Sequence, residues 1–161
     1  MAERPVVNAS PLILLVRGGW LDLLRLAGDE VLVPNHVATE IQRRGADDPT
    51  ARTLADTTWL VGVETPPIPA IIQAWDLGEG ESSVLAWAYA HPGAEAIVDD
   101  LPARRCAAAL GIPVRGALGL VLTAKRRGVI PEARPVVTQL RQAGMYLSDH
   151  IMEQALALVG E

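Results

Sequence analysis

Residues 94–100, Ala-Glu-Ala-Ile-Val-Asp-Asp, decide the fold class of this chain. A short apolar run ends there at two adjacent aspartates, Asp99 and Asp100, and a helical pattern follows at once over residues 101–110. The β-branched residues favour a buried strand, and the two carboxylates mark its end. Open α/β sheets place their functional side chains at the carboxyl ends of strands. We therefore expect Asp99 and Asp100 to lie at such an edge.

Outward from this stretch, short apolar runs alternate with helical patterns along the whole chain. Strands are expected at residues 4–8, 30–33, 59–63, 94–98 and 111–115. Helices are expected from Pro11 to Gly18 and at residues 20–27, 35–44, 71–75, 101–110, 118–127, 133–142 and 148–159, with a further one ending near Tyr89. This alternation predicts an α/β fold, a three-layer α/β/α sandwich around a mainly parallel sheet with right-handed crossovers.

Two helix details follow from local sequence. Ser10 is expected to be the N-cap of the first helix, because serine favours that position and Pro11 suits the first helical position. In the last helix, an apolar stripe is expected to pack on the sheet or on a partner subunit. This stripe comprises Ile151, Ala155, Leu158 and Val159.

The length of 161 residues fits one domain, residues 1–161, with helices at about 133–159 packing on it or on a partner. Hydrophobic residues make up 50% of the chain and aromatic residues 4%, which predicts an aliphatic core. Cys106, the single cysteine, suits a reducing compartment and is expected to be buried and inert. The sequence has no signal peptide and no apolar run of about 20 residues, so a cytoplasmic location is expected.

Charge is unevenly distributed along the chain. The formal net charge is −5, but residues 101–146 hold eight basic residues and one acid, a net +7, which leaves −12 for the rest. Such asymmetry indicates a basic face beside an acidic region, which suits a nucleic-acid partner. A solvated basic surface without a ligand explains the charge equally well.

Two glutamates fall on apolar helix faces. Glu40 shares a stripe with Val37 and Ile41, and Glu81 lies on the core side of its helix while Glu79 faces the opposite way. A carboxylate in such a place needs a partner. For Glu40 that partner is either Arg44, four residues later, or a metal ion.

Four acids, Glu40, Glu81, Asp99 and Asp100, therefore stand at strand ends or beside them, and Asn8 ends the first strand in the matching place. Converging carboxylates without enough bases need a hard cation such as Mg²⁺ or Mn²⁺. Such an ion activates water and stabilises a phosphodiester transition state. The glycines of residues 76–83 form no phosphate loop, since no Gly-Lys-Ser/Thr sequence follows and the loop is acidic.

Several stretches together resemble the PIN-domain family, and more narrowly a PIN-like branch similar to VapC-type toxin ribonucleases. They are Val7-Asn8-Ala9-Ser10-Pro11-Leu12-Ile13, Val33-Pro34 through Glu40, Gly78-Glu79-Gly80-Glu81, Asp99-Asp100 with Ala103-Arg104, and Ala124-Lys125-Arg126-Arg127-Gly128. No single motif is specific, but their order and spacing match over nearly the whole chain.

This resemblance implies an α/β/α nuclease fold, a Mg²⁺ or Mn²⁺ cofactor, an RNA substrate, a homodimer and an antitoxin protein as partner. Carried over by position, the metal ligands are Asn8, Glu40, Glu81 and Asp100, with Asp99 as a possible substitute, and the four acids are also the catalytic residues. Ser10 holds a ligand or water. The candidates for RNA phosphates are Arg104, Arg105, Lys125, Arg126 and Arg127.

Asn8 departs from the family pattern, which has aspartate at this position. Asparagine keeps an oxygen ligand but loses a negative charge, so metal binding is expected to weaken. The first hypothesis is a Mg²⁺- or Mn²⁺-dependent endoribonuclease. The alternative is an inactive PIN-like module that binds RNA or protein, and a third reading is a small-molecule or nucleotide-binding α/β domain.

Overall fold

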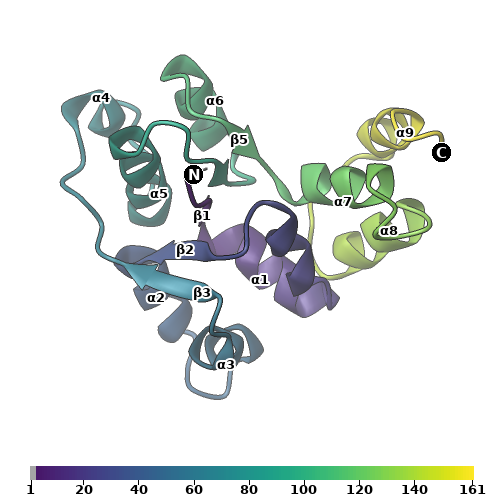
Figure 1. Cartoon of the computed structure of the whole chain (residues 1–161), viewed down its shortest axis with the longest axis horizontal. Coiled ribbons are helices and arrows are strands. Elements are labelled where there is room, and N and C mark those ends of the chain that lie inside the picture. The colour runs from purple at the N-terminus through teal and green to yellow at the C-terminus, as the bar shows by residue number, and fades with distance from the viewer. Residues whose placement is uncertain (1–2) are drawn as a thin grey trace.

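A computed structural model describes residues 3–161 and contains a five-stranded sheet with every strand parallel, flanked by helices (Figure 1). The strand order is β3-β2-β1-β4-β5. The strands are β1 Val6–Val7, β2 Val31–Pro34, β3 Leu60–Val63, β4 Ala96–Ile97 and β5 Val114–Arg115. The predicted α/β class with a parallel central sheet is confirmed.

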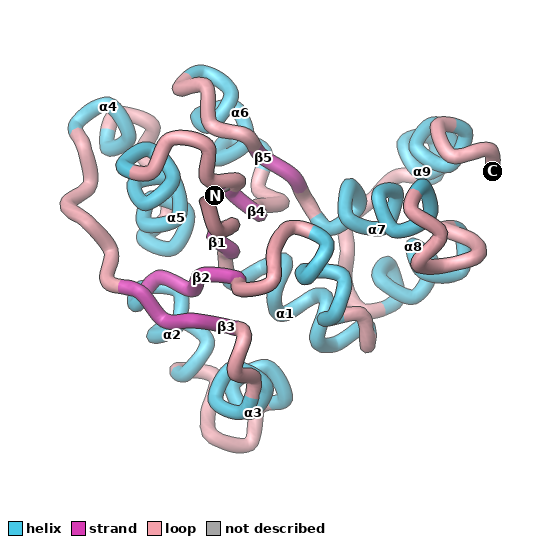
Figure 2. The backbone as a smooth tube through the Cα atoms, viewed as in Figure 1, coloured by secondary structure: helices cyan, strands magenta, loops and turns pink. Residues whose placement is uncertain are grey.

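Helices connect each strand to the next (Figure 2). The helices before β4 are α1 Ala9–Gly18, the 3₁₀ helix η1 Leu21–Leu26, α2 Asn35–Gln42, α3 Pro49–Asp56, α4 Ala70–Gln73 and α5 Glu79–Ala90. Those after β4 are α6 Leu101–Ala109, α7 Ala117–Arg126, α8 Arg134–Gln142 and α9 Asp149–Ala157. Most of these bounds lie within two or three residues of the predicted ones.

The strand order creates a topological switch point beside β1. The chain runs outward from β1 to β2 and β3, then returns to place β4 on the other side of β1. Val6 and Val7 pair with Ala96 and Ile97, and the amide of Asn8 donates to the Ile97 carbonyl at 3.0 Å. Ligands of open α/β sheets bind at such a switch point, outside the carboxyl ends of the strands.

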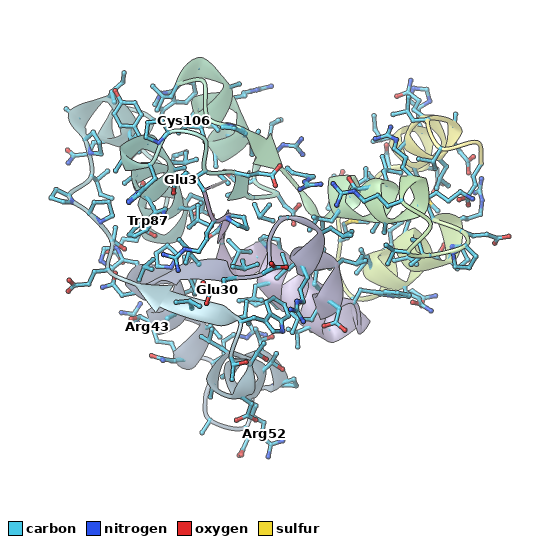
Figure 3. The ribbon with its side chains drawn as sticks, viewed as in Figure 1. Glu3, Glu30, Arg43, Arg52, Trp87 and Cys106 are labelled. Carbon is cyan, nitrogen blue, oxygen red and sulfur yellow. The ribbon has the colours of Figure 1, made fainter. Side chains whose placement is uncertain are left out.

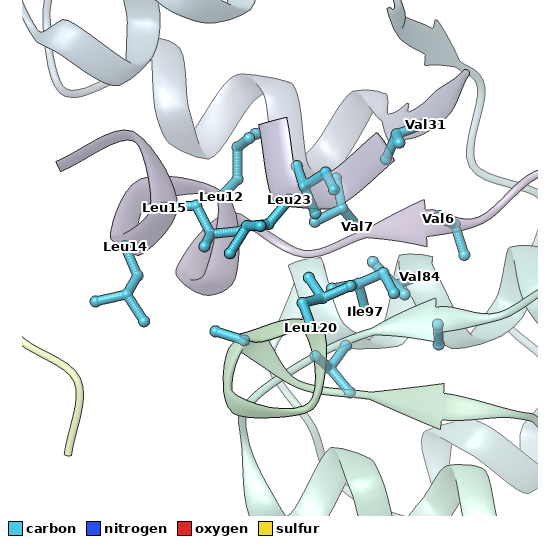
Figure 4. Packing of buried hydrophobic residues seen from close by; sticks show 14 of the residues in the cluster. Val6, Val7, Leu12, Leu14, Leu15, Leu23, Val31, Val84, Ile97 and Leu120 are labelled. Carbon is cyan, nitrogen blue, oxygen red and sulfur yellow. The ribbon is translucent and has the colours of Figure 1, made fainter. Parts of the chain in front are cut away.

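The core around the sheet is aliphatic, as predicted. Val6 and Val7 of β1, Leu15 of α1, Ile97 of β4 and Leu120 of α7 are fully buried and belong to one cluster at the sheet centre (Figure 4). Complete burial of each such side chain contributes roughly 1.5–3 kcal/mol. The sheet centre is therefore a rigid base for the residues that follow β1 and β4.

Cys106 is buried on α6 (Figure 3). Burial raises the pKa of its thiol, which favours the unreactive protonated form. The prediction of a buried, inert cysteine agrees with this environment.

Aspartate and serine side chains cap several helices. Asp48 caps α3, Asp100 caps α6 by accepting the Ala103 amide at 3.0 Å, and Ser148 caps α9. The expectation for Ser10 is wrong: α1 begins at Ala9, so Asn8 holds the N-cap position and Ser10 lies exposed in the first turn. Only Asn8 lies between β1 and α1, so the N-cap position falls two residues before Ser10.

The C-terminal helices gather on the side of the molecule away from α4 and α5 (Figure 1). α8 packs against α1 and α7, and α9 buries Met152, Ala155 and Leu156. Ile151 is 46% exposed and Leu158, just after α9, is 69% exposed, so these two members of the predicted stripe do not pack on the sheet, and their packing on a partner subunit stays a prediction. α9 lies at the periphery, so its neighbours cover one face only.

No helix among residues 3–161 combines the length and the apolar character needed to cross a membrane.

Asp100→Ala is expected to lower the free energy of unfolding by about 1 kcal/mol, because it removes the cap of α6. Asp100→Asn keeps a capping oxygen and is expected to retain nearly full stability. Urea denaturation of the two variants measures this difference. Equal stability of Asp100→Ala and wild type would show that the cap is unimportant.

Candidate metal centre

Asn8 sits at the switch point with an unusual side-chain environment. It is 2% exposed, and its Nδ2 donates to Glu81 Oε1 at 3.2 Å. Although Asn8 is the N-cap residue of α1, its side chain makes no capping bond. Its Oδ1 is buried without a hydrogen-bond partner. Buried acceptors are almost always paired, so this oxygen is suited to a group that binds there.

Glu40 reaches the same place from α2. A Cβ added to Gly80, in the first turn of α5, would lie 2.9 Å from Asn8 Oδ1 and 3.0 Å from Glu40 Oε2. The two oxygens therefore flank the place that a Cβ on Gly80 would take, and this place is called the gap beside Gly80. Val37, on the inner face of α2, closes the gap with its Cγ2 at 3.8 Å from the same point.

Glu81 comes from the turn that holds Gly80 and lies half-buried beside Asn8. Its Oε2 folds back over Gly78, the N-cap residue of α5. Negative side chains are stabilised at the N-terminus of a helix by the helix dipole. α5 thus holds Glu81 in place while Asn8 binds its other oxygen.

Electrostatic strain concentrates on Glu40. Glu40 as a whole is exposed, but partial desolvation of its carboxyl group raises the pKa of that group. The nearby Glu81 carboxylate raises this pKa further, while Arg43 and Arg44 lower it. Of the two alternative partners of Glu40, Arg44 does not form the ion pair, because Arg44 Nε binds Asp48 Oδ1 at 3.1 Å beyond the end of α2. The negative charge at Glu40 is therefore without a direct cationic partner among the described residues.

The donor set fits a hard divalent cation. Asn8, Glu40 and Glu81 supply only oxygen ligands, one of them an unpartnered buried acceptor and one a carboxylate with a raised pKa. Mg²⁺ and Mn²⁺ favour such oxygen sites and usually retain several waters. Among residues 3–161, no three Asp, Glu, His or Cys side chains lie close enough together to hold a metal, so Glu40, Glu81, Asp99 and Asp100 do not form one acidic cluster.

Asp99 and Asp100 lie at the adjacent strand end but serve helix termini. Asp99 Oδ1 accepts the amide of Ala117 at the start of α7, at 2.8 Å. Burial raises the pKa of Asp99, while this hydrogen bond and the charge of Arg104 lower it in part. Asp100 is exposed and caps α6. In the part of the chain that the structure describes, no hydrogen bond joins either aspartate to Asn8, Glu40 or Glu81.

The predicted phosphate-binding residues differ in their surroundings. Ser10, Arg104, Arg105, Arg126 and Arg127 are exposed, and Arg127 also donates to the Leu26 carbonyl at 3.3 Å. Lys125 is half-buried, with Nζ 2.8 Å from the Pro131 carbonyl oxygen and 3.5 Å from Glu161 Oε2.

Much of the positive charge of residues 101–146 is offset by acids outside that segment. Arg115, Lys125, Arg134 and Arg141 pair with Glu95, Glu161, Glu153 and Asp149 respectively. The expected basic face is therefore reduced to its unpaired arginines. Among these arginines, Arg104 lies beside Asp99 and Gly116, at the strand end next to Asn8.

Sequence reasoning missed two contributors to this edge. The only sequence signal for Gly80 is that it is a glycine in an expected helix, where glycine is unfavourable. The contact between Asp99 and α7 joins positions 18 residues apart, and no local pattern indicates it.

A family model named DUF3368 and described as a PIN domain matches residues 4–161. The chain belongs to the PIN-domain family. PIN domains are nuclease-type domains that generally depend on divalent metals and commonly bind RNA. No curated protein sequence matches the chain.

Glu40→Gln is expected to stabilise the protein at pH 7 when no divalent ion is present. The raised pKa means that the folded state disfavours the charged Glu40 carboxylate, which lowers the free energy of unfolding. This loss of stability grows as the pH rises through the folded pKa and vanishes below the ordinary glutamate value. Glutamine carries no charge and avoids the loss. Thermal unfolding in EDTA from pH 4 to 8 measures it.

The matched control is Glu79→Gln, which changes an exposed glutamate on the same turn as Glu81. It is expected to give no gain in stability at any pH. A Glu40→Gln variant that is less stable than wild type at pH 7 would contradict the electrostatic description.

Proposed function

We propose that this chain is a Mg²⁺- or Mn²⁺-dependent endoribonuclease of PIN type, the toxin of a toxin–antitoxin pair. The observation that carries the proposal is the buried, unpartnered Asn8 Oδ1, which borders the same gap as the Glu40 carboxylate beside Glu81. When bound, a divalent ion supplies activation of water and stabilises negative charge on a phosphodiester.

The chain's own residues have separate tasks in this proposal. Asn8 orients Glu81 through its amide and offers Oδ1 to the cation, and Glu40 completes the set of oxygen donors. The buried sheet centre under Asn8 keeps these groups in place without a ligand. Such preorganisation reduces the free-energy cost of assembling the site.

Asp99 and Asp100 follow β4, and they are assigned to the side of the proposed site that lies at the end of this strand. Asp99 is held by the α7 amide at the strand end next to Asn8, where its second carboxylate oxygen is suited to orient water or a metal-bound ligand. Asp100 acts there through its charge while it caps α6.

RNA phosphates are proposed to lie along the exposed basic side chains. Arg104 stands beside Asp99, with Nη1 3.3 Å from the Cβ position of Gly116. Its guanidinium is thus suited to a phosphate next to the cut bond. Ser10, Arg105, Lys125, Arg126 and Arg127 are assigned to more distant backbone contacts, in which positive charge supports affinity at low salt.

An antitoxin protein and a second copy of the chain are the proposed protein partners. Exposed apolar side chains on α9, Ile151 and Leu158, supply surface that a partner would cover. The reducing compartment suited to a single cysteine is in keeping with a cytoplasmic toxin.

The second candidate function is a PIN-like module that binds RNA or protein without cleaving it. The observation that favours it is Asn8 itself, because the amide removes one negative charge and already satisfies Glu81 without a metal. This candidate predicts RNA binding that is insensitive to EDTA.

Glu81→Gln is expected to reduce Mn²⁺-dependent cleavage of a fluorescent single-stranded RNA of mixed sequence at least about 100-fold. The variant keeps the size of the side chain but loses the charge that the ion requires. Glu79→Gln, on the exposed side of the same helix, is expected to cleave as wild type does. Gel analysis of timed reactions, with and without EDTA, provides the measurement.

Equal cleavage by Glu81→Gln and wild type would contradict the proposed mechanism. RNA binding without cleavage, unchanged by EDTA, would instead support the binding module.

A further inference from the structure

We infer that Gly80 is a positioning residue, whose missing side chain preserves the space in which Asn8 Oδ1 and Glu40 hold a divalent cation. This inference rests on the proposed metal-dependent function and extends it to a residue that contributes no ligand atom.

Two oxygens lie close to the place that a Cβ on Gly80 would take, which is the gap beside Gly80. A Cβ at this position would lie 2.9 Å from Asn8 Oδ1, 3.0 Å from Glu40 Oε2 and 3.8 Å from Val37 Cγ2. Real Cβ atoms essentially never lie within 3.0 Å of another atom in this way, and the contact to Glu40 Oε2 is at this limit. Even the smallest side chain would therefore displace one or both oxygens or fill the space between them.

Backbone conformation does not explain this glycine. Gly80 has no positive φ, unlike Gly93 and Gly111, which lie in turns. It is the second residue of α5, and alanine forms helices more readily than glycine, so the helical backbone there does not require glycine. The residue is buried, so no solvent contact accounts for it either.

A cation explains both the gap and its lining. Asn8 Oδ1 is buried without a hydrogen-bond partner, and the neighbouring Glu40 carboxylate is close enough to Glu81 for their charges to interact. Both groups attract positive charge. Mg²⁺ binds oxygens at about 2.0–2.1 Å and somewhat larger ions at up to about 2.6 Å, so an ion bonded to these oxygens and a methyl group cannot share the gap.

The test compares Gly80→Ala with Gly62→Ala in the full chain. Gly62 lies in β3 without a positive φ, and a Cβ there would meet no atom within 4 Å, which makes it a matched glycine control. Titration calorimetry with Mn²⁺ measures affinity, and thermal unfolding in EDTA measures stability without the ion.

Gly80→Ala is expected to bind Mn²⁺ at least about 10-fold more weakly than wild type, or not at all. Its unfolding temperature in EDTA is expected to stay close to that of wild type, because better helix propensity offsets the strain on the two side chains. If Gly80 were important only for folding, Gly80→Ala would lower the unfolding temperature and leave the Mn²⁺ affinity of the folded protein unchanged. Gly62→Ala is expected to bind Mn²⁺ as wild type does.

Wild-type affinity in Gly80→Ala would overturn the inference and leave the proposed function intact. Absence of Mn²⁺ binding by wild type would overturn both. If Gly80→Ala does not fold, the comparison moves to the Glu40→Asp background, where the shorter carboxylate relieves the crowding at Oε2 and both kinds of ligand oxygen remain. Glu40→Asp with Gly80→Ala is then expected to bind Mn²⁺ more weakly than Glu40→Asp alone, and equal binding would overturn the inference.

Discussion

The parallel pairing of β1 with its neighbours is the constraint on which the rest of the structure depends. It aligns the carboxyl ends of β1 and β4, so that Asn8 and Asp99 follow paired strands at the switch point. It also directs α1, α2 and α6 to start from that edge, which brings Glu40 beside Asn8. Because the valines and leucines under this edge are fully buried, the polar groups above them rest on a base that cannot move easily.

Much of this arrangement follows from sequence patterns. Apolar runs ending in polar residues identify the strands, and their alternation with helical patterns predicts a parallel sheet. The same patterns place Asn8, Glu40 and Glu81 near one edge, because the topology leaves few other places for polar groups on apolar faces. The PIN-domain assignment from residue order is confirmed by a family match over residues 4–161.

The failures share a physical cause, since each depends on contacts between segments distant in sequence. Arg44 suits Glu40 by helical spacing, yet a cap residue of the next helix, Asp48, binds it. Ser10 has good capping chemistry, but the strand end occupies the N-cap position. The apolar stripe of α9 is real in the sequence, while packing at the periphery decides which part of it is buried. The gap at Gly80 arises from three separate elements, which no local rule brings together.

Mn²⁺ titration calorimetry on wild type and Asn8→Asp at neutral pH tests the central claim most directly, because it needs no knowledge of the RNA. The account predicts that wild type binds the ion and that Asn8→Asp binds it at least about 10-fold more tightly, since a carboxylate replaces an amide at a buried ligand position. It also predicts that Asn8→Asp is less stable than wild type in EDTA, because two carboxylates then face each other where Asn8 now donates to Glu81. Failure of both proteins to bind Mn²⁺ would contradict the account.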